Sequence, residues 1–131
     1  MFDKSLIIAV DFDGTCVTHD YPTIGKDIGA VPILRRLTEA GHRLVLWTMR
    51  SEISLNKAKD WFSDNDIPLW AAQYNPEQLD WTTSPKCFAN LYIDDAALGC
   101  PLMMSSLSTR PYVDWHKVEQ ILVEQGIITY V

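Results

Sequence analysis

The sequence lacks a long hydrophobic run and has few cysteines. Its first apolar run, residues 6–10, is five residues long. This is far below the roughly 18 residues that span a membrane, and it is also too short for the core of a signal peptide. The three cysteines, Cys16, Cys87 and Cys100, are an odd number at no metal-ligand spacing. These absences argue against a membrane protein and a disulfide framework, and they favour a cytoplasmic protein with reduced thiols.

Basic residues are also scarce relative to acidic ones. The chain has 11 Lys and Arg against 17 Asp and Glu, which gives a net charge of −6 and an isoelectric point near 4.8. Such a surface repels nucleic-acid phosphates and anionic membranes. The charge therefore argues against nucleic acid as a partner and against docking on a membrane surface.

The composition that remains is that of an ordinary globular domain. The chain has 131 residues, of which 47% are hydrophobic and 21% charged. A domain of this size buries about two-thirds of the surface that its unfolded chain exposes, and it forms a hydrophobic core without disulfides or metal ions. No linker, repeat or low-complexity segment interrupts the chain, so we expect one domain over residues 1–131.

Buried strands alternate with amphipathic helices along the chain. The expected strands are 6–10, 43–48, 68–71 and 91–94, and the expected helices follow Pro32, Ser51 or Ser54, and Asp114. The polar stretch 72–86 is expected to be a long loop. Strands that alternate with helices predict right-handed crossovers and a parallel sheet covered on both faces, which is a three-layer, doubly wound, Rossmann-like α/β fold.

The sharpest motif is the string Asp-Phe-Asp-Gly-Thr at residues 11–15, directly after the first buried strand. Open α/β sheets bind ligands at the carboxyl ends of their strands. A turn would explain Asp13 and Gly14, but it does not require Asp11 at the end of an apolar strand. The string therefore indicates a functional site.

Two weaker signals occupy the same position on later strands. Thr48 ends the second strand, and Asp94 and Asp95 end the strand 91–94. In a parallel sheet these ends meet, which would bring several carboxylates together. Like charges about 4 Å apart repel by roughly 4 kcal/mol at an effective dielectric of 20, so the cluster needs a cation or a proton. Hard oxygen ligands favour Mg²⁺.

These residues, together with Lys86, resemble the four motifs of the haloacid dehalogenase superfamily, and the motifs span residues 11–95 of the chain. The resemblance implies a Mg²⁺-dependent phosphatase that hydrolyses phosphate monoesters. Asp11 would be the nucleophile that forms an aspartyl-phosphate, and Asp13 would be the general acid and base. Thr48 would hold a phosphoryl oxygen, and Lys86 would hold the charge of Asp11 and of the phosphate. The implied metal ligands are Asp11, Asp13, Asp94 and Asp95.

Further substrate contacts are expected next to these motifs. Met49 and Arg50 follow Thr48, and Arg50 is positioned to reach a second anionic group of a substrate, although a surface arginine is an equal alternative. His19 is expected at the surface or against substrate rather than on the metal. The segments between the motifs are too short for a cap domain, so the site would be open. A large substrate or a neighbouring subunit in a homo-oligomer would then cover it.

Two other classes of protein share parts of this pattern. A response-regulator receiver also carries aspartates, a threonine and a lysine at the edge of a sheet, but in a different order along the chain. A catalytically silent phosphate-binding or interaction domain on the same fold is the second alternative. The substrate class stays open between small metabolites and macromolecules, and release of phosphate would separate an enzyme from a module.

Overall fold

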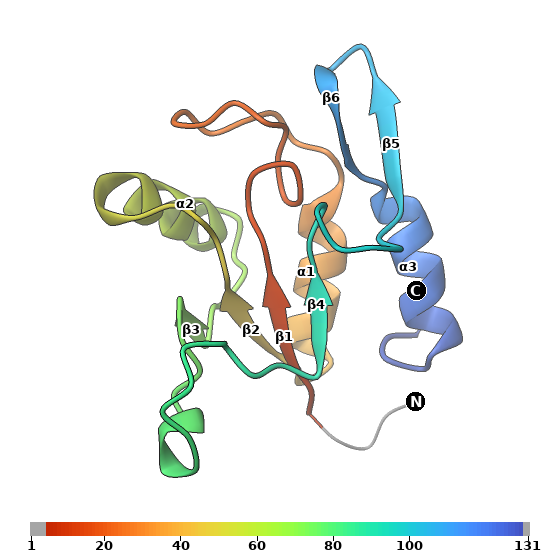
Figure 1. Ribbon diagram of the computed structural model, residues 1–131. Coiled ribbons are helices and arrows are strands. Elements are labelled where there is room, and N and C mark those ends of the chain that lie inside the picture. Colours follow the sequence, from red (N-terminus) through yellow and green to blue (C-terminus); the bar gives the residue numbers. More distant parts are fainter. Residues whose placement is uncertain (1–4, 130–131) are drawn as a thin grey trace.

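The computed structural model describes residues 5–129 and shows an α/β protein with a four-stranded parallel sheet. In chain order the elements are β1 (Ile7–Val10), α1 (Ala30–Glu39), β2 (Arg43–Leu46), α2 (Glu52–Asp64), β3 (Ala71–Ala72), the 3₁₀ turn η1 (Gln78–Asp80), β4 (Leu91–Ile93), β5 (Leu102–Ser105), β6 (Ser108–Val113) and α3 (Trp115–Glu124). The sheet order is β3-β2-β1-β4, and β5 pairs with β6 in a separate hairpin (Figure 1).

Strand β1 lies in the middle of the sheet because all four of its side chains are apolar and buried. It pairs in parallel with β2 on one side and with β4 on the other. The chain therefore moves outward from β1 to β3 and then returns to the opposite side of β1. This reversal of direction next to β1 is where open α/β sheets bind ligands.

The three α-helices bury their apolar sides in one core. Leu34 of α1, Phe62 of α2 and Leu122 of α3 share a cluster with Ile8 and Leu44 of the sheet. The expected helix starts are close to those observed: Ser51 precedes α2 in a capping box, and the Asp114 side chain accepts a hydrogen bond at the start of α3. The predicted helices are thus confirmed, and α1 begins two residues before Pro32.

The opposite face of the sheet differs from the expected helical layer. Its smaller cluster joins Ile7, Ala9 and Val45 of the sheet to Cys87 and Ala89 of the connection between β3 and β4. Among residues 5–129, the connection has η1 and no α-helix. Its polar composition and prolines do not sustain an amphipathic helix, so a loop carries the return crossover.

The hairpin β5–β6 was not expected from the sequence. Pro101 precedes β5 and Pro111 lies within β6, and β5 is exposed along its length, so the sequence shows no alternating pattern there. In Figure 1 the hairpin rises beyond the carboxyl edge of the sheet. The end of β6 is attached to the first motif, because Val113 N–H donates to the carbonyl of Gly14 (3.0 Å) and Trp115 Nε1 donates to that of Thr15 (2.7 Å).

The element β3 is shorter than the predicted strand 68–71: it begins three residues later and ends one residue later. Within the described part of the chain, no helix combines the length and apolar character that crossing a bilayer requires.

Candidate functional site

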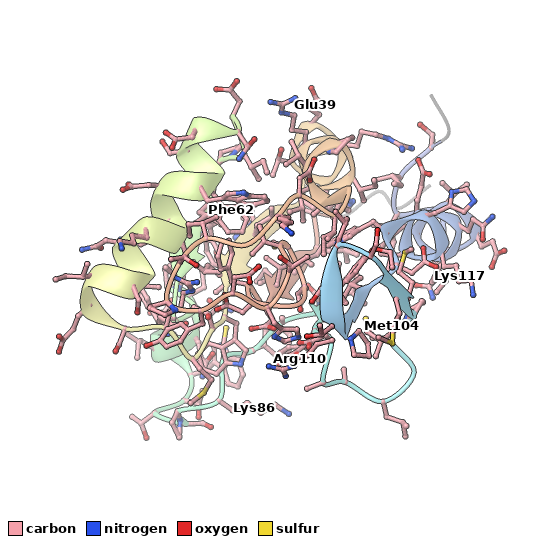
Figure 2. All side chains as sticks on the ribbon, turned by 90° about the horizontal axis from the view of Figure 1, so that it is seen from above. Glu39, Phe62, Lys86, Met104, Arg110 and Lys117 are labelled. Carbon is pink, nitrogen blue, oxygen red and sulfur yellow. The ribbon has the colours of Figure 1, made fainter. Side chains whose placement is uncertain are left out.

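A cavity of about 300 Å³ opens at the carboxyl end of the sheet. It is lined by Asp11, Trp47, Thr48, Met49, Gln73 and Asp94. Figure 2 looks down on this end of the molecule, with Phe62 of α2 on one side and Met104 of the hairpin on the other. The structure therefore brings together four residues that the sequence predicted from separate motifs: Asp11, Thr48, Met49 and Asp94.

Three carboxylates form a cluster next to this cavity. Asp11, Asp94 and Asp95 each present one oxygen atom, and these three atoms lie within 4.8 Å of one another. Thr15 joins two of them, because its hydroxyl donates to Asp11 Oδ2 (2.9 Å) and accepts from the backbone N–H of Asp95 (3.0 Å). The predicted meeting of the first and last motifs is thus observed.

The environment of Asp11 makes its ionised form costly. Burial, and after it the negative charge of Asp94, raises the pKa of Asp11 from 3.8 to about 7. A bound cation would offset this repulsion, and a group of carboxylate oxygens is suited to a hard divalent ion. The residues present therefore fit a metal of this class.

The glycine of the first motif allows the close approach of two side chains. A Cβ atom on Gly14 would lie 2.0 Å from His19 Nε2 and 2.7 Å from Asp95 Oδ2, and the backbone here has a φ of +78°. His19 Nε2 lies 3.0 Å from Asp95 Oδ2. His19 is thus a largely buried partner of a cluster residue, rather than the surface residue or substrate contact that we expected.

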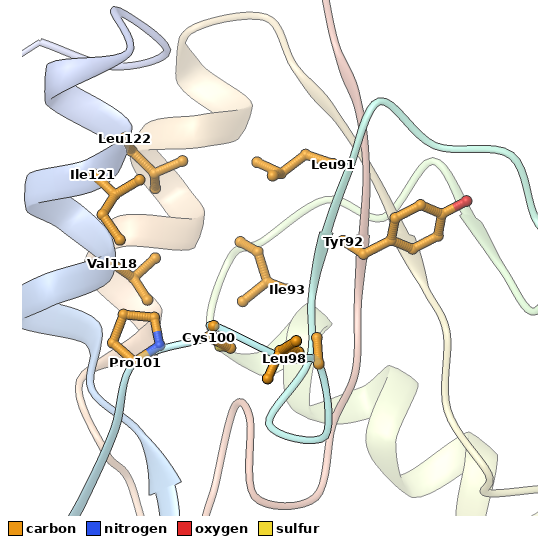
Figure 3. Close-up of a pocket in the computed structure, with 11 residues that line it drawn as sticks. Leu91, Tyr92, Ile93, Leu98, Cys100, Pro101, Val118, Ile121 and Leu122 are labelled. Carbon is orange, nitrogen blue, oxygen red and sulfur yellow. The ribbon is translucent and has the colours of Figure 1, made fainter.

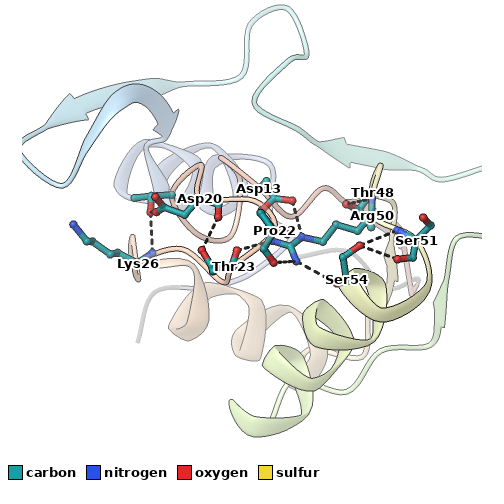
Figure 4. Close-up of polar contacts among 10 residues, drawn as sticks. Asp13, Asp20, Pro22, Thr23, Lys26, Thr48, Arg50, Ser51 and Ser54 are labelled. Atoms are coloured by element: carbon teal, nitrogen blue, oxygen red, sulfur yellow. Dashed lines mark hydrogen bonds and ion pairs between the residues drawn. The ribbon is translucent and has the colours of Figure 1, made fainter.

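Asp13 faces a different neighbour from Asp11. Its Oδ2 accepts from Arg50 Nε and its Oδ1 accepts from Arg50 Nη2, each at 2.8 Å (Figure 4). Its side chain does not belong to the carboxylate cluster of Asp11. The geometry therefore places the predicted metal-binding carboxylate of Asp13 against an arginine instead.

Arg50 is 1% exposed, and every N–H group of its guanidinium has a partner. Besides Asp13 it donates to the carbonyl oxygens of Pro22 (3.1 Å), Thr23 (2.8 Å) and Ser54 (3.2 Å). The first two belong to the flap, which we define as residues 14–29. The prediction that Arg50 binds substrate is corrected, because the flap encloses its charge and leaves no donor free.

Gln73 holds the backbone of the second motif at Thr48, a role that we did not expect from the sequence. Its side chain accepts from the N–H of Thr48 (2.9 Å) and donates to the carbonyl of the same residue (2.6 Å). Its backbone has a φ of +68°, which is uncommon outside glycine. Met49 is 98% exposed at the mouth of the cavity. A polar residue directly after a strand was the one available signal for Gln73.

Lys86 lies apart from the carboxylates. Its Nζ is 5.8 Å from the centre of the Tyr92 ring, and it lines a different cavity of about 370 Å³ with Trp81 and Phe88. Within residues 5–129, no hydrogen bond or ion pair joins Lys86 to Asp11 or Asp94. The structure does not bring the predicted lysine to the cavity that Asp11 lines.

Another cavity, of about 220 Å³, lies between β4 and α3 and has a mostly apolar lining (Figure 3). Leu91 and Ile93 of β4 face Val118 and Leu122 of α3 across it, whereas the ring of Tyr92 points away. It carries none of the predicted site residues.

Fold and site together define the class: an α/β protein with a carboxylate cluster at the carboxyl end of a parallel sheet. A solved structure from Bacteroides thetaiotaomicron, described as a conserved protein, is similar to this chain. The two share 33% sequence identity over 93% of each chain, with a TM-score of 0.76. The chain therefore belongs to the same family as that protein. No protein-family model matches the chain, and no curated protein matches it.

Proposed function

We propose that this protein is a metal-dependent phosphatase of the haloacid dehalogenase type, acting on phosphate monoesters. The supporting observation is that Asp11, Thr48 and Asp94 line one cavity, although they lie in three separate motifs. The same proposal assigns the sheet to the Rossmann-like fold of that superfamily, without a cap domain and with a loop in place of the helical layer on its second face.

In the proposed reaction Asp11 is the nucleophile and Asp13 is the general acid and base. A carboxylate oxygen of Asp11 attacks phosphorus, and the P–O bond to the alcohol breaks as Asp13 gives that oxygen a proton. Water then attacks the phosphorus of the aspartyl-phosphate and gives its proton to Asp13, so that Asp11 leaves as a carboxylate and phosphate is released. Thr48, at the rim of the cavity, would donate a hydrogen bond to a phosphoryl oxygen.

Mg²⁺ is the proposed cofactor, and it would supply positive charge against the phosphate and the carboxylates. Asp11, Asp94 and Asp95 would hold it, since their oxygens already lie within 4.8 Å of one another. The hydroxyl of Thr15 links two of these residues, because it donates to the Asp11 carboxylate and accepts from the backbone N–H of Asp95. Met49, at the mouth of the cavity, is exposed, which agrees with an open site that a large phosphorylated substrate or a second subunit would cover.

The test is release of inorganic phosphate from para-nitrophenyl phosphate and from a panel of phosphorylated metabolites, with Mg²⁺ and with EDTA. We expect Mg²⁺-dependent release that is lost in Asp11→Asn. A matched control is Asp60→Asn, a change on the outer side of α2, which should keep full activity. Absence of release from every substrate by the parent protein would contradict the proposal.

The placement of Lys86 favours a second candidate, a catalytically silent phosphate-binding or interaction domain. A phosphatase of the proposed type needs a cation near Asp11, and Lys86 lies over Tyr92 instead. Binding of phosphate or of Mg²⁺ measured by calorimetry, without turnover of any substrate, would select this candidate.

A further inference from the structure

The buried ion pair between Asp13 and Arg50 sets the direction of the Asp13 carboxylate. Both oxygens of Asp13 accept from one guanidinium at 2.8 Å, which is the bidentate arrangement that fixes orientation best. No other side chain among residues 5–129 bonds to the Asp13 carboxylate. Arg50 is therefore the hydrogen-bonding side chain that orients the Asp13 carboxylate.

Arg50 in turn is held by parts of the chain that surround the site. The flap accepts two of its hydrogen bonds through the carbonyls of Pro22 and Thr23, and the first turn of α2 accepts one through Ser54 (Figure 4). The rings of Phe12 and Tyr21 lie 5.0 and 5.1 Å from its Cζ atom. The guanidinium is thus a rigid support, fixed on several sides before any substrate arrives.

The flap that supports Arg50 is itself closed by internal contacts. Thr18 Oγ1 donates to Asp20 Oδ2 (2.6 Å) and accepts from the N–H of Lys26 (2.8 Å). Gly25 packs so closely that a Cβ atom there would lie 2.1 Å from the carbonyl oxygen of Thr18. These contacts stabilise the flap conformation in which the carbonyls of Pro22 and Thr23 accept hydrogen bonds from Arg50.

This pairing leaves part of the Asp13 carboxylate without a partner. A carboxylate has about four lone-pair sites, and the two N–H bonds of Arg50 use one on each oxygen. The side chain of Asp13 is 18% exposed, whereas that of Arg50 is 1% exposed. The Asp13 carboxylate is therefore partly accessible, while the arginine that holds it is enclosed.

We propose that Arg50 is a positioning residue for proton transfer by Asp13, and not a substrate-binding residue. This inference rests on the proposed function. Arg50 holds the Asp13 carboxyl group where it gives a proton to the leaving oxygen as the P–O bond breaks, and where it takes one from water in the second step. The arginine itself exchanges no proton and touches no substrate.

The experiment measures kcat and KM of the full chain for a series of substituted phenyl phosphates whose leaving groups differ in basicity. A basic leaving group such as phenolate needs the proton from Asp13, whereas para-nitrophenolate needs it much less. In Arg50→Gln we expect kcat/KM, which reports formation of the aspartyl-phosphate, to fall by roughly 10–100-fold more for phenyl phosphate than for para-nitrophenyl phosphate, because a misplacement near 1 Å has effects of this size.

Two further variants keep the test decisive if Arg50→Gln fails to fold. Arg50→Lys retains the charge but lacks the planar fork, so it should show the same dependence on the leaving group. Adding Arg50→Lys to Asp13→Asn should leave the dependence of the single Asp13→Asn variant unchanged. Arg35→Gln, on the outer side of α1, is the matched arginine control and should behave as the parent protein does.

The outcomes separate the inference from the proposed function. An equal loss of kcat/KM for all leaving groups, whether it arises from kcat or from KM, would show a structural or a substrate-binding role and would overturn the inference while the phosphatase stands. A parent protein without activity on any phosphate ester overturns the proposed function, and the inference with it.

Discussion

Asp11 and Asp13 are two residues apart in one motif, yet they occupy opposite electrostatic environments. Asp13 has a buried guanidinium on both of its oxygens, so its charge is compensated within the protein. Asp11 has Asp94 and Asp95 beside it and a pKa raised to about 7. This difference is what the proposed function requires of one short motif: a fixed carboxyl group for proton transfer, and an uncompensated one beside a bound cation.

The largest expected effect comes from removing the carboxylate of Asp11. Asp11→Asn should reduce steady phosphate release to background, because an amide is not a nucleophile toward phosphorus. The same change removes a charge from the cluster and should raise the melting temperature in EDTA. Both quantities are measured on one preparation, with mass spectrometry to exclude deamidation. Activity within tenfold of the parent protein would refute the role of Asp11.

The compensated carboxylate should give a smaller and different loss. Asp13→Asn should lower the steady rate by about 10²–10⁴-fold, the usual range for general acid–base catalysis. With para-nitrophenyl phosphate, whose leaving group needs little protonation, Asp11 should still be phosphorylated once. Rapid-mixing absorbance should therefore show a burst close to one equivalent and then little turnover. A steady rate equal to that of the parent protein would remove Asp13 from the mechanism.

A third change tests what holds the uncompensated cluster together. His19 lies 3.0 Å from Asp95, so His19→Ala should weaken Mg²⁺ binding by about 10–100-fold, as is typical when a partner of a metal ligand is lost. Isothermal calorimetry measures this without turnover. His116→Ala, on the exposed side of α3, is the matched control. Unchanged Mg²⁺ affinity in His19→Ala would show that the contact with Asp95 is incidental.

The smallest effect concerns stability in EDTA. The folded protein holds a proton on Asp11 up to about pH 7, whereas the unfolded chain releases it near 3.8. Between these values the folded state binds more protons, so the free energy of unfolding should fall as the pH rises, by at most about 1.4 kcal/mol per pH unit. Urea unfolding at several pH values measures the slope. Asp11→Asn should flatten it, and an identical slope in that variant would contradict the assignment.

Much of the fold followed from local pattern. Apolar runs on consecutive residues marked β1 and β2, and spacings of three and four marked the helices. The hairpin β5–β6 was not predicted because β5 is exposed throughout and β6 is buried only at Tyr112 and Val113, so neither strand shows a regular alternation. The helical layer predicted on the second face is absent from the described residues, because a loop with one 3₁₀ turn covers that face instead.

The candidate site likewise has features that the sequence predicted and features that only the tertiary structure decided. That Asp11, Thr48, Asp94 and Asp95 would meet was determined by sequence alone, because each ends a strand and parallel strands end at one edge. The partners of these residues were decided by tertiary structure: Arg50 turns inward to Asp13, His19 folds over Gly14 to Asp95, and Lys86 lies on Tyr92. The physical reason is that position along a strand is a local property of the chain. The direction of a long charged side chain instead depends on which carbonyls, rings and carboxylates distant segments bring within its reach.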